Sequence, residues 1–215
     1  MLNIKVCGIT ILEQLYQLDK LFVDYAGFVF NKKSNQNVIG KIQAEELKYA
    51  DVDIKKVGVF CNTDYNSVLT YIKNYGLDLI QLNGAESPEL CKMLSKEIAV
   101  IKTFNIDNFD SHKINSIINA YDDAVDYYSF DVDINLNNKG ISNSIDWNMI
   151  GKTSIEKPFF IGGAGVKPSD APMIHQFKHP DFFGVDLNNN FEKISGQKDT
   201  SLIVSFINAL NQVVN

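Results

Sequence analysis

The sequence contains no arginine, and all 20 of its cationic side chains are lysine. Arginine binds carboxylates and phosphates through two parallel hydrogen bonds, so its absence excludes that contact anywhere in this chain. Any oxyanion that the protein binds must be held by lysine, by hydroxyl groups or by backbone amides. The formal net charge of −6 argues against nucleic acid and against an anionic membrane surface as partners, because both attract basic surfaces.

Cysteine and histidine are also scarce. The three cysteines, Cys7, Cys61 and Cys91, form no closely spaced pair, which argues against a disulfide framework or a zinc knuckle. The three histidines are too scattered for a metal-ligand cluster. The sequence has no apolar run near the ~20 residues that a membrane helix needs, and no signal segment at its start. We therefore expect a protein of the reducing cytoplasm, without a metal and without a membrane partner.

What the chain does have is enough apolar content, 45% of 215 residues, to bury one substantial core. Eight short apolar runs recur along it, and segments with helical periodicity or helix-start signals lie between them. The runs predicted as strands are 4–7, 26–30, 56–60, 78–82, 99–104, 127–131, 158–163 and 182–187. The predicted helices are 12–22, 66–75, 88–94, 114–121 and 201–213.

Strict alternation of strand and helix predicts parallel strands joined by right-handed crossovers. Eight such units without a linker favour an α/β fold of one domain over residues 1–215, a (β/α)₈ TIM barrel, with an open doubly wound sheet as the alternative. In barrels the catalytic groups lie at the carboxyl ends of strands. Polar or reactive residues that end or follow predicted strands are Cys7, Gln81, Asn83, Asp131, Gly162, Gly163, Asp186, Asn188, Asn189 and Asn190.

Cys7 ends the first predicted strand, just before Gly8. Thr10 and Glu13 then have the spacing of a capping box, which predicts that a helix begins there. A helix N-terminus beside the sulfur would lower the pKa of the thiol and give a thiolate that accepts a proton. The alternative is that Cys7 is a small buried hydrophobe, as free cysteines usually are.

Asp131 ends the sixth apolar run directly, so its carboxyl group is expected over the barrel mouth. Partial desolvation there would keep it protonated and able to act as an acid. Asp133 is interpreted instead as part of a polar loop that continues through 135–144. A thiolate on the first strand and a carboxylic acid on the sixth would face each other, which suits proton transfer.

The loops after the seventh and eighth strands carry Gly162 and Gly163 in one and the three asparagines 188–190 in the other. Barrels commonly bind phosphate in these two loops through backbone amides. The glycines alone also fit a simple tight turn. In a chain without arginine, we expect a backbone phosphate site here.

Lys102, inside the fifth strand, offers a different chemistry. A barrel lysine with a lowered pKa can form a Schiff base with a carbonyl substrate. The alternative, which we favour, is a lysine that neutralises barrel carboxylates, because nothing nearby in the sequence identifies a partner acid.

Several segments together resemble one family. They are "KVCGIT" at 5–10, "AGFVF" at 26–30 followed by "KS" at 33–34, "VGVF" at 57–60, "QLNG" at 81–84, "IK" at 101–102, "FD" at 130–131, "DW" at 146–147, "GG" at 162–163, "GVD" at 184–186 and "KD" at 198–199. In order and register they resemble the phosphoribosylanthranilate isomerase family, TIM-barrel enzymes of tryptophan biosynthesis, over nearly the whole chain.

The resemblance implies an Amadori rearrangement of N-(5-phosphoribosyl)anthranilate to 1-(2-carboxyphenylamino)-1-deoxyribulose 5-phosphate. Asp131 would protonate the ring oxygen and Cys7 would remove the proton from C2. The two phosphate loops would hold the ribose phosphate, and Asp186 a sugar hydroxyl or the amine. It also implies no cofactor, a small phosphosugar as the partner, and a cytoplasmic monomer or homodimer.

The chain departs from the family pattern at substrate-binding positions. Gln36 stands where the family has an arginine that meets the anthranilate carboxylate, and Asn83 stands where it has histidine. The loop after the sixth strand keeps only Gly140 of a glycine-rich stretch. Gln36 carries no charge, so we expect weaker carboxylate binding unless Lys32 or Lys33 reaches in. A Schiff-base aldolase or lyase using Lys102 and a non-catalytic phosphometabolite-binding homologue remain alternatives.

Overall fold

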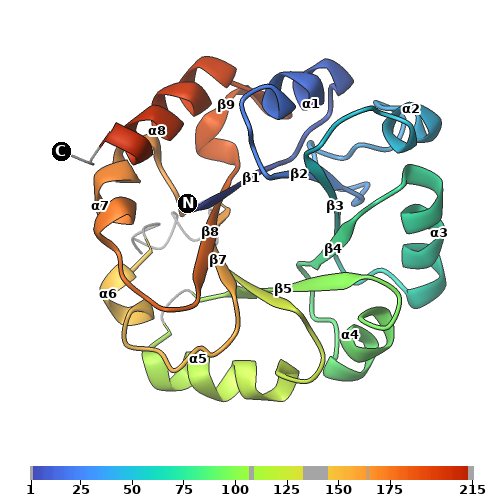
Figure 1. The fold of residues 1–215 in the computed structure, drawn as a ribbon. Helices are drawn as coiled ribbons and strands as arrows, with labels where there is room; N and C mark the ends of the chain where they lie inside the picture. Colours follow the sequence, from blue (N-terminus) through green and yellow to red (C-terminus); the bar gives the residue numbers. More distant parts are fainter. Residues whose placement is uncertain (1, 107–108, 133–144, 164, 213–215) are drawn as a thin grey trace.

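Eight parallel strands close into a barrel in the order β1 to β8. The computed structural model describes residues 2–106, 109–132, 145–163 and 165–212. Strand β8 returns to pair with β1, from Asn3 opposite Gly184 to Val6 opposite Leu187. The helices form an outer ring around these strands (Figure 1). The predicted TIM barrel is therefore confirmed, and the open-sheet alternative is wrong.

The elements follow the predicted alternation. The barrel strands are β1 (Asn3–Cys7), β2 (Tyr25–Val29), β3 (Lys55–Phe60), β4 (Leu79–Leu82), β5 (Ala99–Asn105), β6 (Tyr127–Asp131), β7 (Phe159–Gly163) and β8 (Phe182–Leu187). The helices are α1 (Leu12–Asp19), α2 (Ala44–Lys48), α3 (Tyr65–Tyr75), α4 (Pro88–Leu94), α5 (Ser111–Ile118), α6 (Trp147–Ile150), α7 (Ala171–Gln176) and α8 (Thr200–Gln212). Short 3₁₀ turns are η1 (Asn119–Tyr121), η3 (Pro168–Asp170) and η4 (Asn189–Phe191), and a hairpin of β9 (Glu192–Ile194) and β10 (Gln197–Lys198) follows β8.

Short polar side chains fix the starts of several helices. Asp64, Ser87 and Asp110 accept hydrogen bonds from backbone amides three residues ahead, at the starts of α3, α4 and α5. The start of α4 behind Ser87 agrees with the sequence, and Pro88 fits its first turn. Gly76, with a φ of +61°, ends α3 in the left-handed conformation that glycine adopts freely.

The predicted capping box at Thr10 and Glu13 is wrong. Helix α1 begins at Leu12, and its N-cap Ile11 makes no side-chain cap. The Thr10 hydroxyl donates instead to the backbone carbonyl of Gly196, in the turn between β9 and β10. The Thr10 hydroxyl, which the local sequence predicted to cap a helix, therefore bonds to a residue 186 positions away in the chain.

Buried apolar side chains form two separate clusters, one outside the barrel strands and one inside them. One apolar layer lies between the strands and the helices. Inside the barrel, a second cluster of Val57, Leu79, Ile101 and Phe160 fills the interior. Because side chains alternate along a strand, and Val6, Val185 and Phe130 belong to the outer layer, their neighbours Lys5, Cys7, Asp186 and Asp131 point inward. These inward groups are polar, so the barrel interior holds a polar site above its apolar filling.

Candidate active site

A cavity of about 450 Å³ opens at the carboxyl ends of the strands. Four of the predicted site residues line it, namely Asn83, Asp131, Asn188 and Asn189. Its volume lies within the range of small-molecule sites. The end of the barrel where it opens is the end at which barrel enzymes carry their catalytic groups.

Asp131 is half-buried at the end of β6 and faces this cavity. Its Oδ1 accepts a hydrogen bond from the backbone amide of Val132 at 2.7 Å. On the neighbouring strand β7, a Cβ at Gly163 would lie only 1.8 Å from Asp131 Oδ2, and Gly163 has a φ of +66°. Both observations show that only glycine at this position leaves room for the carboxyl group.

Cys7 is 4% exposed and stands at the end of β1, opposite Gly27 of β2. The predicted lowering of its pKa is wrong, because burial raises the pKa of this thiol against the opposing effect of nearby Lys5. The amides of Gly8 and Ile9 donate to the carbonyl of Gly27, so they do not serve the sulfur. Among the described residues, those that line the 450 Å³ cavity do not include Cys7.

Lys5 and Asp186 form an ion pair beside Cys7. They are direct neighbours in the register of β1 and β8, and Lys5 Nζ lies 2.7 Å from Asp186 Oδ2 with both side chains buried. Burial alone would lower the pKa of Lys5, but Asp186 and Cys7 outweigh it and raise the pKa. Gly162 makes room for Asp186, since a Cβ there would lie 2.2 Å from the Asp186 Cβ. Asp186 Oδ1 is buried and has no hydrogen-bond partner among the described residues.

A second buried ion pair lies in the hairpin of β9 and β10 that follows β8. Lys198 Nζ is 2.7 Å from Glu192 Oε1 and donates to Asn188 Oδ1 at 2.9 Å. Burial lowers the pKa of Lys198 in spite of Glu192. The Gln36 amide donates to Asn188 at 2.7 Å, to Glu192 at 2.8 Å and to Asn189 at 3.1 Å. Gln36 is thus tied to the protein's own oxygens.

The two predicted phosphate loops lie side by side. The Asn190 amide donates to the backbone carbonyl of Val166 at 2.8 Å, which joins the loop after β8 to the loop after β7. Gly162 and Gly163 are the last two residues of β7. Phosphate binding by these loops remains a prediction.

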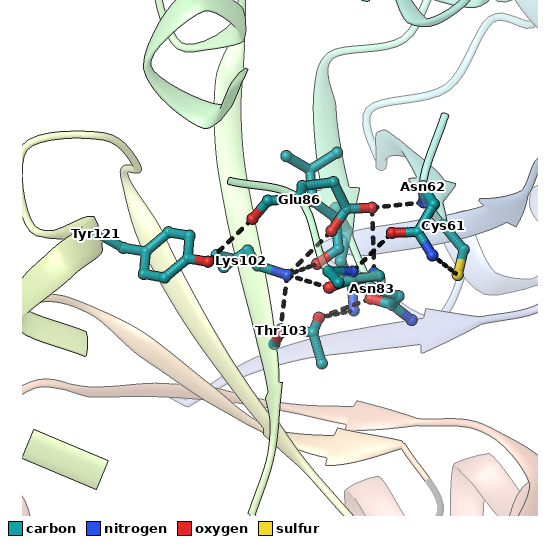
Figure 2. A network of polar contacts seen from close by, with 11 residues as sticks. Cys61, Asn62, Asn83, Glu86, Lys102, Thr103 and Tyr121 are labelled. Carbon is teal, nitrogen blue, oxygen red and sulfur yellow. Dashed lines mark hydrogen bonds and ion pairs between the residues drawn. The ribbon is translucent and has the colours of Figure 1, made fainter. Parts of the chain in front are cut away.

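Lys102 does not offer a free amine. Its Nζ donates to Glu86 Oε2 at 3.0 Å and to the carbonyls of Gly84 and Leu82 at 2.7 and 3.1 Å. Figure 2 shows the ammonium group surrounded by these oxygens. A Schiff base needs an amine that is free to attack a carbonyl, whereas this nitrogen is bonded to four oxygens of the protein. The geometry agrees with the charge-neutralising interpretation, with Glu86 as the carboxylate.

Asn83 stands at the rim of the cavity and is oriented by a short chain of hydrogen bonds. The Gln81 amide donates to Thr103 Oγ1 at 3.0 Å, and Thr103 Oγ1 donates to Asn83 Oδ1 at 2.6 Å. Glu86 holds the backbone on either side of this rim in place, because its Oε1 accepts hydrogen bonds from the backbone amides of Asn62 and Gly84 (Figure 2). With its oxygen engaged, Asn83 presents a side-chain NH₂ donor at the rim.

Sequence reasoning missed four charged residues that shape the site, which are Lys5, Glu86, Glu192 and Lys198. For Lys5 a signal was present, because it lies two residues before Cys7 on a strand and so shares its face. Lys198 belongs to the "KD" segment of the family resemblance, but its ion pair with Glu192 across the β9–β10 hairpin was not predicted. Glu86 pairs with Lys102 of the next strand, and no local pattern identifies that pair.

Metal-binding clusters and membrane-spanning helices are both absent from the described ranges. No group of three histidine, cysteine, aspartate or glutamate side chains among the described residues lies close enough to hold a metal ion. None of the helices in the described ranges is long and apolar enough to span a bilayer. The predictions for Asp133, for the polar segment 135–144 and for Gly140 lie outside the described residues.

Comparison with known proteins gives a consistent set of relatives. The model of the family described as N-(5'phosphoribosyl)anthranilate (PRA) isomerase matches residues 4–209. N-(5'-phosphoribosyl)anthranilate isomerase of Parabacteroides distasonis is 33% identical over 95% of this chain and 91% of its own length. The enzyme of the same name from Phocaeicola vulgatus is 31% identical, over 98% of each chain.

Solved structures of similar proteins agree. Phosphoribosyl anthranilate isomerase from Thermotoga maritima is 25% identical with a TM-score of 0.81, over 99% of this chain and 100% of its own. A phosphoribosyl anthranilate isomerase in complex with reduced 1-(o-carboxyphenylamino)-1-deoxyribulose 5-phosphate is 25% identical with a TM-score of 0.79, over the same shares.

Proposed function

Because the chain belongs to the N-(5'-phosphoribosyl)anthranilate isomerase family, we propose that Cys7 and Asp131 carry the two proton transfers of this isomerase's reaction. The enzyme converts N-(5-phosphoribosyl)anthranilate into 1-(2-carboxyphenylamino)-1-deoxyribulose 5-phosphate, a step of tryptophan biosynthesis. One observation supports this assignment of roles. Cys7 and Asp131 are the last residues of β1 and β6, both side chains point into the barrel, and Asp131 lines the cavity.

Asp131 acts as the general acid. In its protonated form it gives a proton to the ring oxygen of the ribose, the C1–O bond breaks, and the nitrogen lone pair forms an iminium at C1. The room that Gly163 leaves for the carboxyl group supports this role, since the acid must reach into the cavity. A positioned general acid contributes roughly 10²–10⁴-fold to the rate.

Cys7 acts as the general base. As the thiolate it takes the proton from C2, and the electrons of the C2–H bond form the enolamine by neutralising the iminium. The enolamine then tautomerises to the ketone, with the C2 hydroxyl losing a proton and C1 gaining one. The buried position of Cys7 makes its thiolate a strong base, because desolvation disfavours the charged form and so raises the pKa of the thiol.

Asp186 and the two loops bind the sugar phosphate. Asp186 Oδ1 is a buried acceptor without a partner among the described residues, which suits a hydroxyl or amine of the substrate. The loops that carry Gly162, Gly163 and 188–190 adjoin each other through Asn190, and their backbone amides are our candidates for the phosphate.

Binding of the anthranilate end is weaker than an arginine would give. Gln36 has no charge, and its amide is already shared among Asn188, Asn189 and Glu192. Asn83 offers an NH₂ donor at the rim, and Lys32 and Lys33 lie on the loop after β2. We propose that these neutral donors and lysine charges replace the single fixed guanidinium.

Two details of the setting complete the proposal. A reducing cytoplasm suits three free cysteines, one of which, Cys61, is exposed. The isomerase of Thermotoga maritima is dimeric. A further solved structure of that enzyme is 26% identical to this chain with a TM-score of 0.76, over 99% of this chain and 100% of its own. We propose a monomer or a homodimer for this chain.

The direct test is turnover of freshly prepared phosphoribosylanthranilate, followed by the loss of its fluorescence. Wild-type protein is expected to consume the substrate, and Asp131→Asn to lower kcat by roughly 10²–10⁴-fold. Asp51→Asn, an exposed aspartate away from the barrel mouth, is the matched control and is expected to keep full activity. Rescue of an isomerase-deficient tryptophan auxotroph tests the overall activity in cells. No turnover and no rescue would favour a non-catalytic homologue.

A further inference from the structure

We propose that Lys5 is a positioning residue for Cys7, whose ammonium group lies beside the sulfur and stabilises the negative charge of the thiolate before it takes the C2 proton. The inference rests on the proposed role of Cys7 as the base. It adds a residue for which neither the cavity nor the family comparison supplies a role.

The geometry places the two groups over the same residue of the neighbouring strand. Lys5 and Cys7 are two residues apart on β1 and point to the barrel interior. Gly27 of β2 lies opposite Cys7, and a Cβ there would be 2.8 Å from Cys7 Sγ and 3.1 Å from Lys5 Nζ. Because Gly27 has no side chain, the ammonium and the sulfur share the space over this residue, where the Lys5 charge acts directly on Cys7.

The charged groups that act on the sulfur are Lys5, Asp186 and Lys198, which come from β1, β8 and β10. Lys5 of β1 pairs with Asp186 of β8, and Lys198 of β10 pairs with Glu192 of β9. Of these, Lys5 is the strongest influence that favours the Cys7 thiolate, and Asp186 opposes it. Asp186 thus holds the ammonium in place while its own charge works against the thiolate. The ammonium has three donors, so one bond to Asp186 leaves others for sulfur.

Another source of stabilisation, the N-terminus of α1, does not serve Cys7. The helix begins at Leu12, and the amides of Gly8 and Ile9 are both bonded to the carbonyl of Gly27. Desolvation of a buried thiolate has to be offset by a nearby positive charge. Within the described part of the chain, the Lys5 ammonium is the nearest group of that kind on the same strand.

The test is an ultraviolet titration of the Cys7 thiolate, recorded as the absorbance difference between each protein and its Cys7→Ala counterpart, so that tyrosines and the other thiols cancel. Lys5→Gln is expected to move the midpoint up by about one pH unit or more. Asp186→Asn is expected to move it down, because the ammonium then faces the sulfur without a competing carboxylate. Lys5→Arg keeps the charge and is expected to restore much of the wild-type midpoint.

Opposite changes in the two midpoints distinguish this role from a structural one, since mere loosening of the barrel would move both midpoints the same way. Lys56→Gln is the matched control and should leave the midpoint unchanged. It removes a buried ammonium of β3 that, in the described contacts, donates only to the backbone carbonyls of Leu47 and Lys48 in α2. An unchanged midpoint in Lys5→Gln, or changes of the same sign, would overturn the proposal. If Lys5→Gln fails to fold, Asp186→Asn alone decides, because a midpoint that does not fall contradicts it.

The titration needs no substrate, so its result is independent of whether the protein is an active isomerase. With activity, Lys5→Gln is expected to lower kcat at neutral pH by about tenfold for each pH unit by which the midpoint rises, and to regain it at alkaline pH with KM unchanged. A loss of kcat that persists at alkaline pH would assign Lys5 a structural role and overturn the proposal.

Discussion

Lys198 and Gln36 donate to the same carboxylate oxygen, Glu192 Oε1, at 2.7 and 2.8 Å. Both also donate to Asn188 Oδ1. The neutral Gln36 amide thus lies beside two acceptors, Glu192 and Asn188, that the Lys198 ammonium also binds. This arrangement explains how the chain tolerates glutamine at a position where the family pattern has a cation, and it makes the cost of that exchange measurable.

Gln36→Arg is expected to lower the KM for the carboxylate-bearing substrate by about tenfold, because a hydrogen bond to a charged group is worth about 1.5–3 kcal/mol. The guanidinium would keep contact with Glu192 and present its remaining donors to the substrate. Lys33→Arg, an exposed change on the same loop, is the control and should leave KM unaltered. Steady-state kinetics decide the matter, and a KM that is unchanged or raised in Gln36→Arg contradicts the prediction.

Gly163→Ala is expected to abolish most of the activity, since the added Cβ would collide with the Asp131 carboxyl group. The matched variant is Gly40→Ala, which has a similar positive φ of +79° but no atom within 4 Å of the new Cβ. Gly40→Ala should cost only about 1 kcal/mol of unfolding free energy and keep its kcat. Urea unfolding and turnover assays separate the two effects. Equal kcat in both variants would show that Asp131 does not depend on Gly163.

Lys102→Met is expected to lower the free energy of unfolding by about 3–5 kcal/mol, because it leaves the buried Glu86 carboxylate without its ion pair. Adding Glu86→Gln should restore part of that loss, since no uncompensated charge then remains. Chemical denaturation measures both. Borohydride treatment with a carbonyl substrate should leave Lys102 unlabelled, and a label there would revive the Schiff-base alternative.

The stability of the protein is expected to fall as the pH rises above 9. Burial raises the pKa of the Cys91 thiol from its ordinary value of 9.0 to about 11. The unfolded chain loses this proton first, so between pH 9 and 11 the folded state loses about 2–3 kcal/mol relative to it. Cys91→Ala should show a flatter decline than wild type, and Cys61→Ala, at an exposed thiol, the same decline. Equal slopes for wild type and Cys91→Ala would contradict this.

The strands were predictable from sequence because each is a short apolar run bounded by polar turns, and their ends alone indicated Cys7, Asp131 and the two phosphate loops. The short helices α2, α6 and α7 were not predicted, since five, four and six residues are too few to show a helical period.

The electrostatics of the site were harder to predict. The sequence suggested a helix terminus beside Cys7, but the neighbouring charge comes from Lys5, and its partner Asp186 is 181 residues away. Such pairs depend on strand register across the closed barrel, which local patterns do not contain. Likewise, Gln36 was identified as a departure from the family, while its contacts with Glu192 became visible only in three dimensions.

The central claim is that Cys7 takes the proton from C2, and the most direct measurement is kcat of Cys7→Ala at saturating substrate, beside Cys61→Ala as the matched loss of a thiol. Binding of the reduced product analogue shows whether each variant keeps its pocket. The account predicts that Cys7→Ala loses roughly 10²–10⁴-fold or more in kcat with its Kd unchanged, while Cys61→Ala matches wild type. Turnover by Cys7→Ala at the wild-type rate would contradict it.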